Sequence, residues 1–239
     1  YIQAYFQYDS KKTGGVTISH LRFGDNPIRS PYYINQADFV ACHNPAYVIQ
    51  GMKMVQDVKP GGVFMINCQW SDEELAHHLN ADAKKYIADN NIQFYTIDGV
   101  KIGKEIGLGG RINTVLQSAF FKIADIIPAD KAKELMKAAA KKSYMKKGQA
   151  IVDMNYAAID RGMEDLKKVE IPADWANAVD NSAADKAEGN GALVEYVNEI
   201  LKPVNAYKGN KLPVSTFMDH VDGTAPNGSA AYEKRGIAV

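Results

Sequence analysis

Three short apolar runs, separated by segments with helical character, constrain the fold more than any other feature of this sequence. They are "ADFVACHN" (residues 37–44), "GVFMINCQ" (62–69) and "IQFYTID" (92–98). Continuous apolar strands alternating with helices are typical of a parallel sheet whose two faces are both covered. The sequence therefore predicts an α/β fold with three layers, α/β/α, around a mixed, largely parallel sheet.

The flanking segments complete this prediction. Residues 45–58 are expected to form a helix that begins at Pro45 and is stopped by the turn "KPGG". Residues 71–91 are expected to form a second helix, opened by a capping box of Ser71 and Glu74. Residues 1–8 and 16–23 are strand-like and suited to a hairpin, which we expect to add the mixed-direction part of the sheet.

The C-terminal half is predicted to be rich in helices. Apolar residues recur at helical spacing in four segments: 107–127, 129–147, 149–169 and 192–204. From residue 211 onward, stretches such as "DGTAPNGSAAYEKRG" are typical of an extended connector. The predicted organisation is thus one domain over residues 1–210 and a connector over residues 211–239.

Composition excludes several classes of function. The chain has 28 basic and 28 acidic residues and zero formal net charge, so it has no overall field to attract nucleic acid or an anionic membrane. No apolar run approaches the length of a membrane span. Cys42 and Cys68 do not form a short-spaced pair, which favours two reduced, buried thiols in a cytoplasmic protein and no metal site. We also find no arrangement typical of a nucleophilic or acid–base catalytic centre.

Three places are candidates for binding an anion or a polar ligand. Lys11 and Lys12 precede two glycines in a predicted turn, which suits either a solvated hairpin tip or an anion site. "GLGGRIN" puts Arg111 and Asn113 in the first turn of a helix, where free N–H groups favour an anion, although the glycines also suit a bend or close helix packing. Asn155 lies mid-helix, either for a specific role or simply exposed on the polar face.

The sequence also resembles a known family. "YFQYDSKKTGGVTISHLRFGDNPIRSPYYINQADFVACHNPAYV", with "GLGGRINTVLQSAFFK" and "IVDMNYAAIDRG" downstream, resembles the third, gamma-type domain of pyruvate:ferredoxin (flavodoxin) oxidoreductases. The similarity covers essentially the whole chain. The resemblance also implies a strand, a glycine-rich turn and a helix at the start of this domain, and we expect this chain to be a fragment that lacks them before Tyr1. The resemblance implies a large cytoplasmic, usually homodimeric enzyme of anaerobic metabolism. Such an enzyme oxidatively decarboxylates pyruvate with coenzyme A to acetyl-CoA and carbon dioxide. The electrons released are passed on to ferredoxin or flavodoxin, an electron transport step.

The resemblance further implies where each ligand binds. Thiamine diphosphate and the [4Fe-4S] clusters are expected in other domains of the same polypeptide, with the connector leading toward the iron–sulfur domain, so that this chain alone is expected to be inactive. Lys12, Asn113 and Asn155 match positions that bind coenzyme A, with Lys11 and Arg111 as possible additional anion contacts. The alternative is a structural interaction module that packs the other domains and caps the active site without binding substrate.

Overall fold

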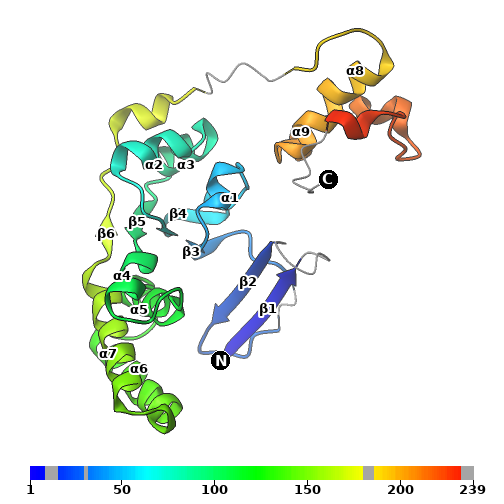
Figure 1. The fold of residues 1–239 in the computed structure, drawn as a ribbon. Coiled ribbons are helices and arrows are strands. Elements are labelled where there is room, and N and C mark those ends of the chain that lie inside the picture. The colour runs from blue at the N-terminus through cyan, green and yellow to red at the C-terminus, as the bar shows by residue number, and fades with distance from the viewer. Residues whose placement is uncertain (9–15, 30–31, 180–185, 233–239) are drawn as a thin grey trace.

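The central sheet has four strands. The computed structural model describes residues 1–8, 16–29, 32–179 and 186–232 (Figure 1). The sheet order is β3 (Ala37–Cys42), β4 (Val58–Asn67), β5 (Gln93–Ile97) and β6 (Lys167–Lys168). The first three strands are mutually parallel, and β6 is antiparallel to β5. The predicted mixed, largely parallel sheet is thus confirmed, and its antiparallel part comes from the short strand β6, which the sequence analysis did not find.

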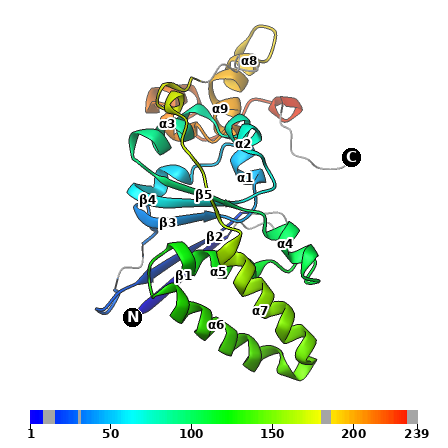
Figure 2. The ribbon, with the colours of Figure 1, turned by 90° about the vertical axis from the view of Figure 1, so that its left-hand side faces the viewer.

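Helices cover both faces of this sheet (Figure 2). One layer consists of α2 (Asp72–His78) and α3 (Ala81–Asp89), and the other contains α4 (Gly99–Glu105), α5 (Asn113–Ile123) and α7 (Gln149–Glu164). Strand β4 joins the two cores, because Phe64 and Ile66 pack toward the α2 and α3 side while Met65 packs toward α4, α5 and α7. All three side chains are fully buried. The predicted three-layer α/β/α arrangement is therefore confirmed.

The predicted hairpin forms, but it does not join the central sheet. Strands β1 (Ile2–Tyr8) and β2 (Thr17–Phe23) pair antiparallel, with Ile2 opposite Phe23. Among the described residues these two strands make a separate two-stranded sheet, so the expectation that they supply the mixed-direction part was wrong. The physical reason lies in how the hairpin is attached. Phe23 packs 6.4 Å from Phe120 of α5 (ring centroids), so the hairpin contacts the helical layer through side chains rather than through strand pairing.

The helix predicted over residues 45–58 is largely wrong. The structure has only one turn, α1 (Ala46–Ile49), and a 3₁₀ turn, η1 (Val55–Asp57), before β4 begins at Val58. The stretch "KPGG" lies inside β4 rather than ending a helix. The strand is irregular here, because the register between β3 and β4 shifts between Val58 and Val63. Gly61, with a φ of +76°, allows the backbone to make this irregularity. A bulge with glycine in the left-handed region gives such a shift.

The helix predicted over residues 71–91 is divided in two. The capping box is confirmed, because Ser71 Oγ accepts a hydrogen bond from the Glu74 N–H while the Glu74 carboxylate accepts one from the Ser71 N–H. Leu79 is extended, and the Asn80 side chain accepts a hydrogen bond from the Ala83 N–H at 2.8 Å, which starts α3 afresh. A second N-cap residue inside the helical pattern thus ended one helix and began the next.

The C-terminal part is helical as predicted, but in shorter pieces after residue 170. Its elements are α6 (Ala129–Tyr144), η2 (Met145–Lys147), η3 (Ala173–Asn177), α8 (Ala192–Tyr196), the π-helical turn η4 (Val197–Leu201), α9 (Lys202–Asn205), η5 (Gly209–Lys211), η6 (Val214–His220) and η7 (Ser229–Tyr232). The extended conformation expected from residue 211 is therefore interrupted by 3₁₀ turns, while the role of this segment as a connector stays a prediction. None of the described helices is both long and apolar enough to cross a membrane.

Candidate functional site

The loop before α5 is folded tightly against α4. The N–H groups of Leu108 and Gly109 both donate to the Gly103 carbonyl, at 2.8 and 2.9 Å. A Cβ atom on Gly103 would lie 2.5 Å from the Gly109 carbonyl oxygen, and Gly109 itself has a φ of +60°. Gly103 and the glycines of "GLGGRIN" thus allow a tight bend and close packing against α4. A bend or close packing was one of the two interpretations of this motif, beside an anion site.

Helix α5 begins without a side-chain cap. Its N-cap residue is Ile112, whose side chain has no polar atom to accept from the first-turn N–H groups. Asn113 lies in the first turn as predicted, but Arg111 precedes the N-cap, so its predicted place in the first turn was wrong. Both side chains are exposed. The N-terminus of an eleven-residue helix carries partial positive charge and N–H groups without intrahelical partners. This end of α5 therefore has the chemistry to receive an anionic or carbonyl-bearing ligand.

Asn155 is held behind this helix start. Its side chain is only 4% exposed, so the alternative of an exposed asparagine on the polar face of α7 was wrong. The Thr114 hydroxyl donates to Asn155 Oδ1 at 3.2 Å, and Asn155 Nδ2 donates to the Ile151 carbonyl at 2.8 Å. Because Thr114 follows Asn113 directly, the two predicted asparagines converge on the same turn. One amide hydrogen and one lone pair of Asn155 remain for further bonds.

A close, polar contact between α5 and α7 continues from this point. One turn along α5, the Ser118 hydroxyl donates to the Ile159 carbonyl at 2.5 Å. A further turn along α7, a Cβ atom on Gly162 would lie 2.4 Å from the Val115 carbonyl oxygen, so only glycine fits there without movement of a helix. We refer to Thr114, Ser118, Asn155 and Gly162 as the α5–α7 seam. The seam fixes the orientation of the α5 N-terminus relative to α7.

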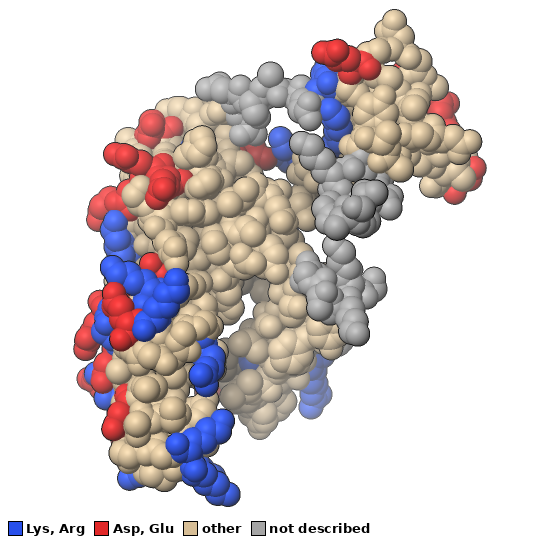
Figure 3. All heavy atoms as spheres, in the orientation of Figure 1, with Lys and Arg blue, Asp and Glu red and all other residues tan. Residues whose placement is uncertain are grey.

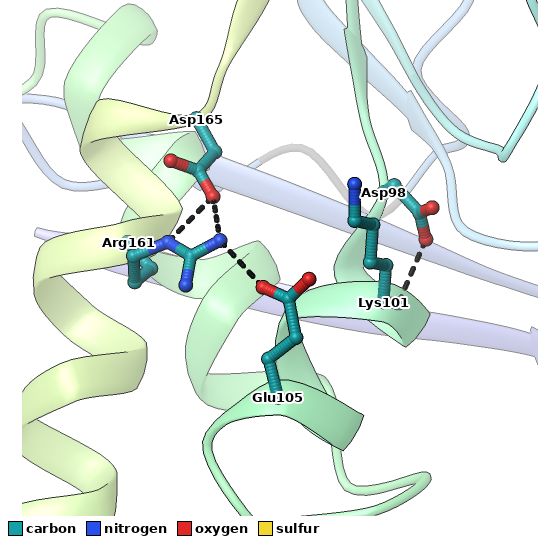
Figure 4. Close-up of polar contacts among 5 residues, drawn as sticks. All are labelled: Asp98, Lys101, Glu105, Arg161 and Asp165. Carbon is teal, nitrogen blue, oxygen red and sulfur yellow. Dashed lines mark hydrogen bonds and ion pairs between the residues drawn. The ribbon is translucent and has the colours of Figure 1, made fainter.

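Ion pairs hold the rest of α7 in place. Arg161 binds Asp165 at 2.5 Å and Glu105 of α4 at 2.9 Å (Figure 4). Hydrogen bonds to these two carboxylates raise the pKa of the Arg161 guanidinium. In the same view Asp98 accepts from the Lys101 N–H at 2.8 Å and caps α4. The single Arg161 charge is thus shared between two carboxylates, so Arg161 positions α7 against α4 and is not available to bind an anionic ligand.

A second ion-pair cluster joins α6 to α7. Asp160 of α7 lies 2.7 Å from the Lys133 ammonium group and 2.8 Å from that of Lys137. Partial burial acts to raise the pKa of Asp160, but the hydrogen bonds from the two lysines outweigh it, and the pKa lies below its ordinary value. The carboxylate therefore stays charged at neutral pH and holds the two helices together.

A cavity of about 330 Å³ opens beside the start of α5. Three polar residues and Phe121 of α5 form one wall, and mostly apolar residues of α6 form the other; the lining includes Asn113, Thr114, Gln117, Phe121, Leu135, Met136, Ala139 and Ser143. Thr114 thus contacts both the cavity and Asn155. The cavity therefore adjoins the first turn of α5, which carries Asn113.

Asn67 is a structurally important polar residue that the sequence analysis missed. It ends β4 and is 4% exposed. Its Nδ2 donates to the His43 carbonyl at 3.0 Å, and its Oδ1 accepts from the Gly99 N–H at 2.9 Å. Asn67 thereby ties the ends of β3 and β5 together at the carboxyl edge of the sheet, where α/β proteins bind ligands. The available signal was a lone amide at the end of an otherwise apolar run.

The predicted site residues therefore fall into two groups. Asn113, Arg111 and Asn155 lie at or directly behind the N-terminus of α5. Lys11 and Lys12 lie outside the described residues, so the expectation that they meet the other three stays a prediction. In the part of the chain that the structure covers, no three His, Cys, Asp or Glu side chains are grouped to hold a metal ion.

Comparison with known proteins agrees with this fold. The family described as "Pyruvate ferredoxin/flavodoxin oxidoreductase" matches residues 1–165, and a second family, described as a "Domain of unknown function", matches residues 183–238. The chain belongs to the pyruvate ferredoxin/flavodoxin oxidoreductase family. It is 53% identical to a pyruvate:ferredoxin oxidoreductase of Moorella thermoacetica and 50% identical to a pyruvate-flavodoxin oxidoreductase of Klebsiella pneumoniae. Each comparison covers 100% of this chain and 20% of the relative, so the chain spans about a fifth of these proteins.

A solved structure shares the fold. The pyruvate oxidoreductase subunit PORC of Thermotoga maritima aligns with a TM-score of 0.54, covering 71% of this chain and 82% of the subunit. The two sequences are 19% identical, so this comparison bears on the fold alone.

Proposed function

We propose that this chain is the gamma-type third domain of a pyruvate:ferredoxin (flavodoxin) oxidoreductase, and that it helps bind coenzyme A. The observation that carries the proposal is the convergence of Asn113 and Asn155 on the uncapped N-terminus of α5, joined through the Thr114 hydroxyl. The full-length relatives named as pyruvate oxidoreductases support the reaction class. In this reaction pyruvate is oxidatively decarboxylated with coenzyme A to acetyl-CoA and carbon dioxide.

Each site residue has a role suited to coenzyme A. Lys12, with Lys11 beside it, supplies a positive charge for a phosphate, and Arg111 extends the basic surface at the start of α5. Asn113 presents an exposed amide that donates to and accepts from the amides of the pantetheine arm. Asn155 contributes its unused amide hydrogen and, through Thr114, fixes the turn that carries Asn113. None of these residues is assigned a catalytic role.

The remaining chemistry belongs to the rest of the polypeptide. The described residues offer no ligand set for a [4Fe-4S] cluster, and burial raises the pKa of the Cys42 thiol to about 11 and also raises that of Cys68, which disfavours the thiolate that a cluster needs. We therefore place the clusters in other domains, and the family resemblance implies the same for thiamine diphosphate. Within a cytoplasmic homodimer these domains pass electrons to ferredoxin or flavodoxin.

A second candidate function is a structural module that packs other domains without touching substrate. The large apolar side chains exposed on the hairpin favour it as an additional role. Lys12→Ala in the full-length enzyme separates the two functions, because acetyl-CoA formation and coenzyme A-independent decarboxylation of pyruvate can be measured side by side. We expect the Michaelis constant for coenzyme A to rise roughly ten-fold or more, since a charge-assisted hydrogen bond contributes about 1.5–3 kcal/mol. Equal loss of both activities would instead support the structural module.

A further inference from the structure

One face of the β1–β2 hairpin is mostly apolar and exposed to solvent. Cross-strand register puts four pairs on this face, and we call the following residues the hairpin face: Ile2 with Phe23, Ala4 with Leu21, Phe6 with Ser19, and Tyr8 with Thr17. All eight are exposed, and the exposed fraction reaches 74% at Ile2 and 71% at Tyr8. None of the eight is charged, and Figure 3 shows mostly uncharged atoms over the hairpin.

The opposite face of the hairpin differs. There His20 stacks on Tyr33 with 5.0 Å between ring centroids, and its Nδ1 accepts a hydrogen bond from the Ile34 N–H at 3.1 Å. Arg22 donates to Gln3 and lies 4.9 Å from the centroid of the Tyr32 ring. This face is partly covered by the segment that follows the hairpin. Among the residues that the structure describes, the hairpin face is open apart from the contact of Phe23 with Phe120 at one end.

An uncovered two-stranded sheet of this kind is unstable in water. Two strands alone are at best marginally stable and need a third strand or a packed helix on their apolar face. Contiguous exposed apolar patches mark interaction surfaces. Because the face has no charge, an ionic partner such as nucleic acid has nothing to bind there. The occupant must itself be apolar.

The size of the face favours an occupant within the same polypeptide. Aromatic side chains offer about 150–250 Å² each, so the exposed fractions of the hairpin face amount to on the order of 600 Å². A stable complex between separate chains buries about 800 Å² per partner, which this face does not reach alone. A tethered partner needs less area, because its effective concentration is high. The full-length relatives are about five times as long as this chain and so contain ample sequence to supply one.

We propose that the hairpin face docks an apolar surface of another domain of the same polypeptide, outside residues 1–239. The inference rests on the proposed function only in that the chain is part of a longer enzyme. It assigns the β1–β2 hairpin a second task, an internal domain interface, beside the proposed role of its lysines in binding coenzyme A.

Hydroxyl-radical footprinting of the full-length protein tests this without any activity measurement. The exposed fractions of 50% for Phe6 and 71% for Tyr8 predict oxidation that is at most about two-fold slower than in the unfolded protein if the face is open. A docked face predicts slowing by ten-fold or more at both residues. Protection near two-fold would overturn the proposal. Protection that is lost as the protein is diluted would identify a second copy as the occupant and would also overturn it.

A pair of variants gives a second readout. Phe6→Asp places a charge on the hairpin face, whereas Gln7→Asp places the same charge on the opposite face one residue along. We expect Phe6→Asp to increase the oxidation rate of Tyr8 at least five-fold in full-length protein, and Gln7→Asp to change it less than two-fold. Equal effects of the two variants would contradict the proposal. Coenzyme A kinetics play no part in either readout, so failure here is distinguishable from failure of the proposed function.

Discussion

Gly162→Ala is the substitution for which the structure predicts the largest effect from a single methyl group. The new Cβ would lie 2.4 Å from the Val115 carbonyl oxygen and 2.8 Å from Ser118 Cβ, so α5 and α7 must separate. Overpacking costs about 1–3 kcal/mol. Separation of the helices also weakens the buried hydrogen bond between Ser118 and Ile159, which costs about 1–3 kcal/mol more. The higher helix propensity of alanine offsets about 1 kcal/mol of this loss. The net expectation is about 1–5 kcal/mol of destabilisation.

Urea unfolding followed by circular dichroism measures this effect as a lower midpoint at unchanged slope. Gly110→Ala is the matched control, because a Cβ atom at this position would have no other atom within 4 Å and the φ of Gly110 is outside the left-handed region. We expect the control to stay within about 0.5 kcal/mol of the original protein. If Gly162→Ala also stays within that limit, the close approach of α5 and α7 is refuted.

Three further predictions concern single groups. Thr114→Val should lower the free energy of unfolding by about 1–3 kcal/mol, because it leaves a buried Asn155 acceptor without its donor. Thr114→Ser keeps the hydroxyl and should retain most of the stability, so equal losses in the two variants would contradict this prediction. Asp160 has a folded pKa below its ordinary 3.8, so its stabilising effect should be complete above that pH and be lost as the pH falls through the lower folded value. Acid titration of Asp160→Asn should therefore show a smaller loss of stability below pH 3.8 than the original chain, and parallel curves would count against the ion pairs. The Cys42 thiol, with a pKa of about 11, should react with a thiol reagent at pH 8 at least a hundred-fold faster after denaturation, whereas a fast native reaction would show it to be accessible.

The layers of the fold could be predicted from the sequence because the central strands β4 and β5 have buried residues on both faces. Burial leaves a run such as "GVFMINCQ" apolar at nearly every position, and that signal does not depend on any distant partner. The helix over residues 45–58 was mispredicted for the converse reason. Pro45 and "KPGG" are helix signals locally, but the pairing of β4 with β3 extends the strand back to Val58 and absorbs the glycines in a bulge. Tertiary pairing overrode local propensity.

The candidate site could be predicted only in part. The start of α5 was identifiable because Arg111 and Asn113 follow glycines at a helix N-terminus. The burial of Asn155 was not, since a mid-helix asparagine has the same local pattern whether its partner is water or Thr114. Asn67 was missed because its two partners, His43 and Gly99, come from segments distant in sequence. Contacts between separate elements carry no signal in local spacing.

The most direct test of the central claim is the Michaelis constant for coenzyme A in the full-length enzyme carrying Asn113→Ala, compared with Gln117→Ala. Gln117 is the matched control, because it is exposed one turn further along α5 and lines the same cavity. A neutral hydrogen bond contributes about 0.5–1.5 kcal/mol, so Asn113→Ala should raise the Michaelis constant for coenzyme A about two- to thirteen-fold. The Michaelis constant for pyruvate should be unchanged. Gln117→Ala should leave both constants within two-fold. Unchanged coenzyme A kinetics in Asn113→Ala, or an equal rise in the two variants, would contradict a coenzyme A site at the N-terminus of α5.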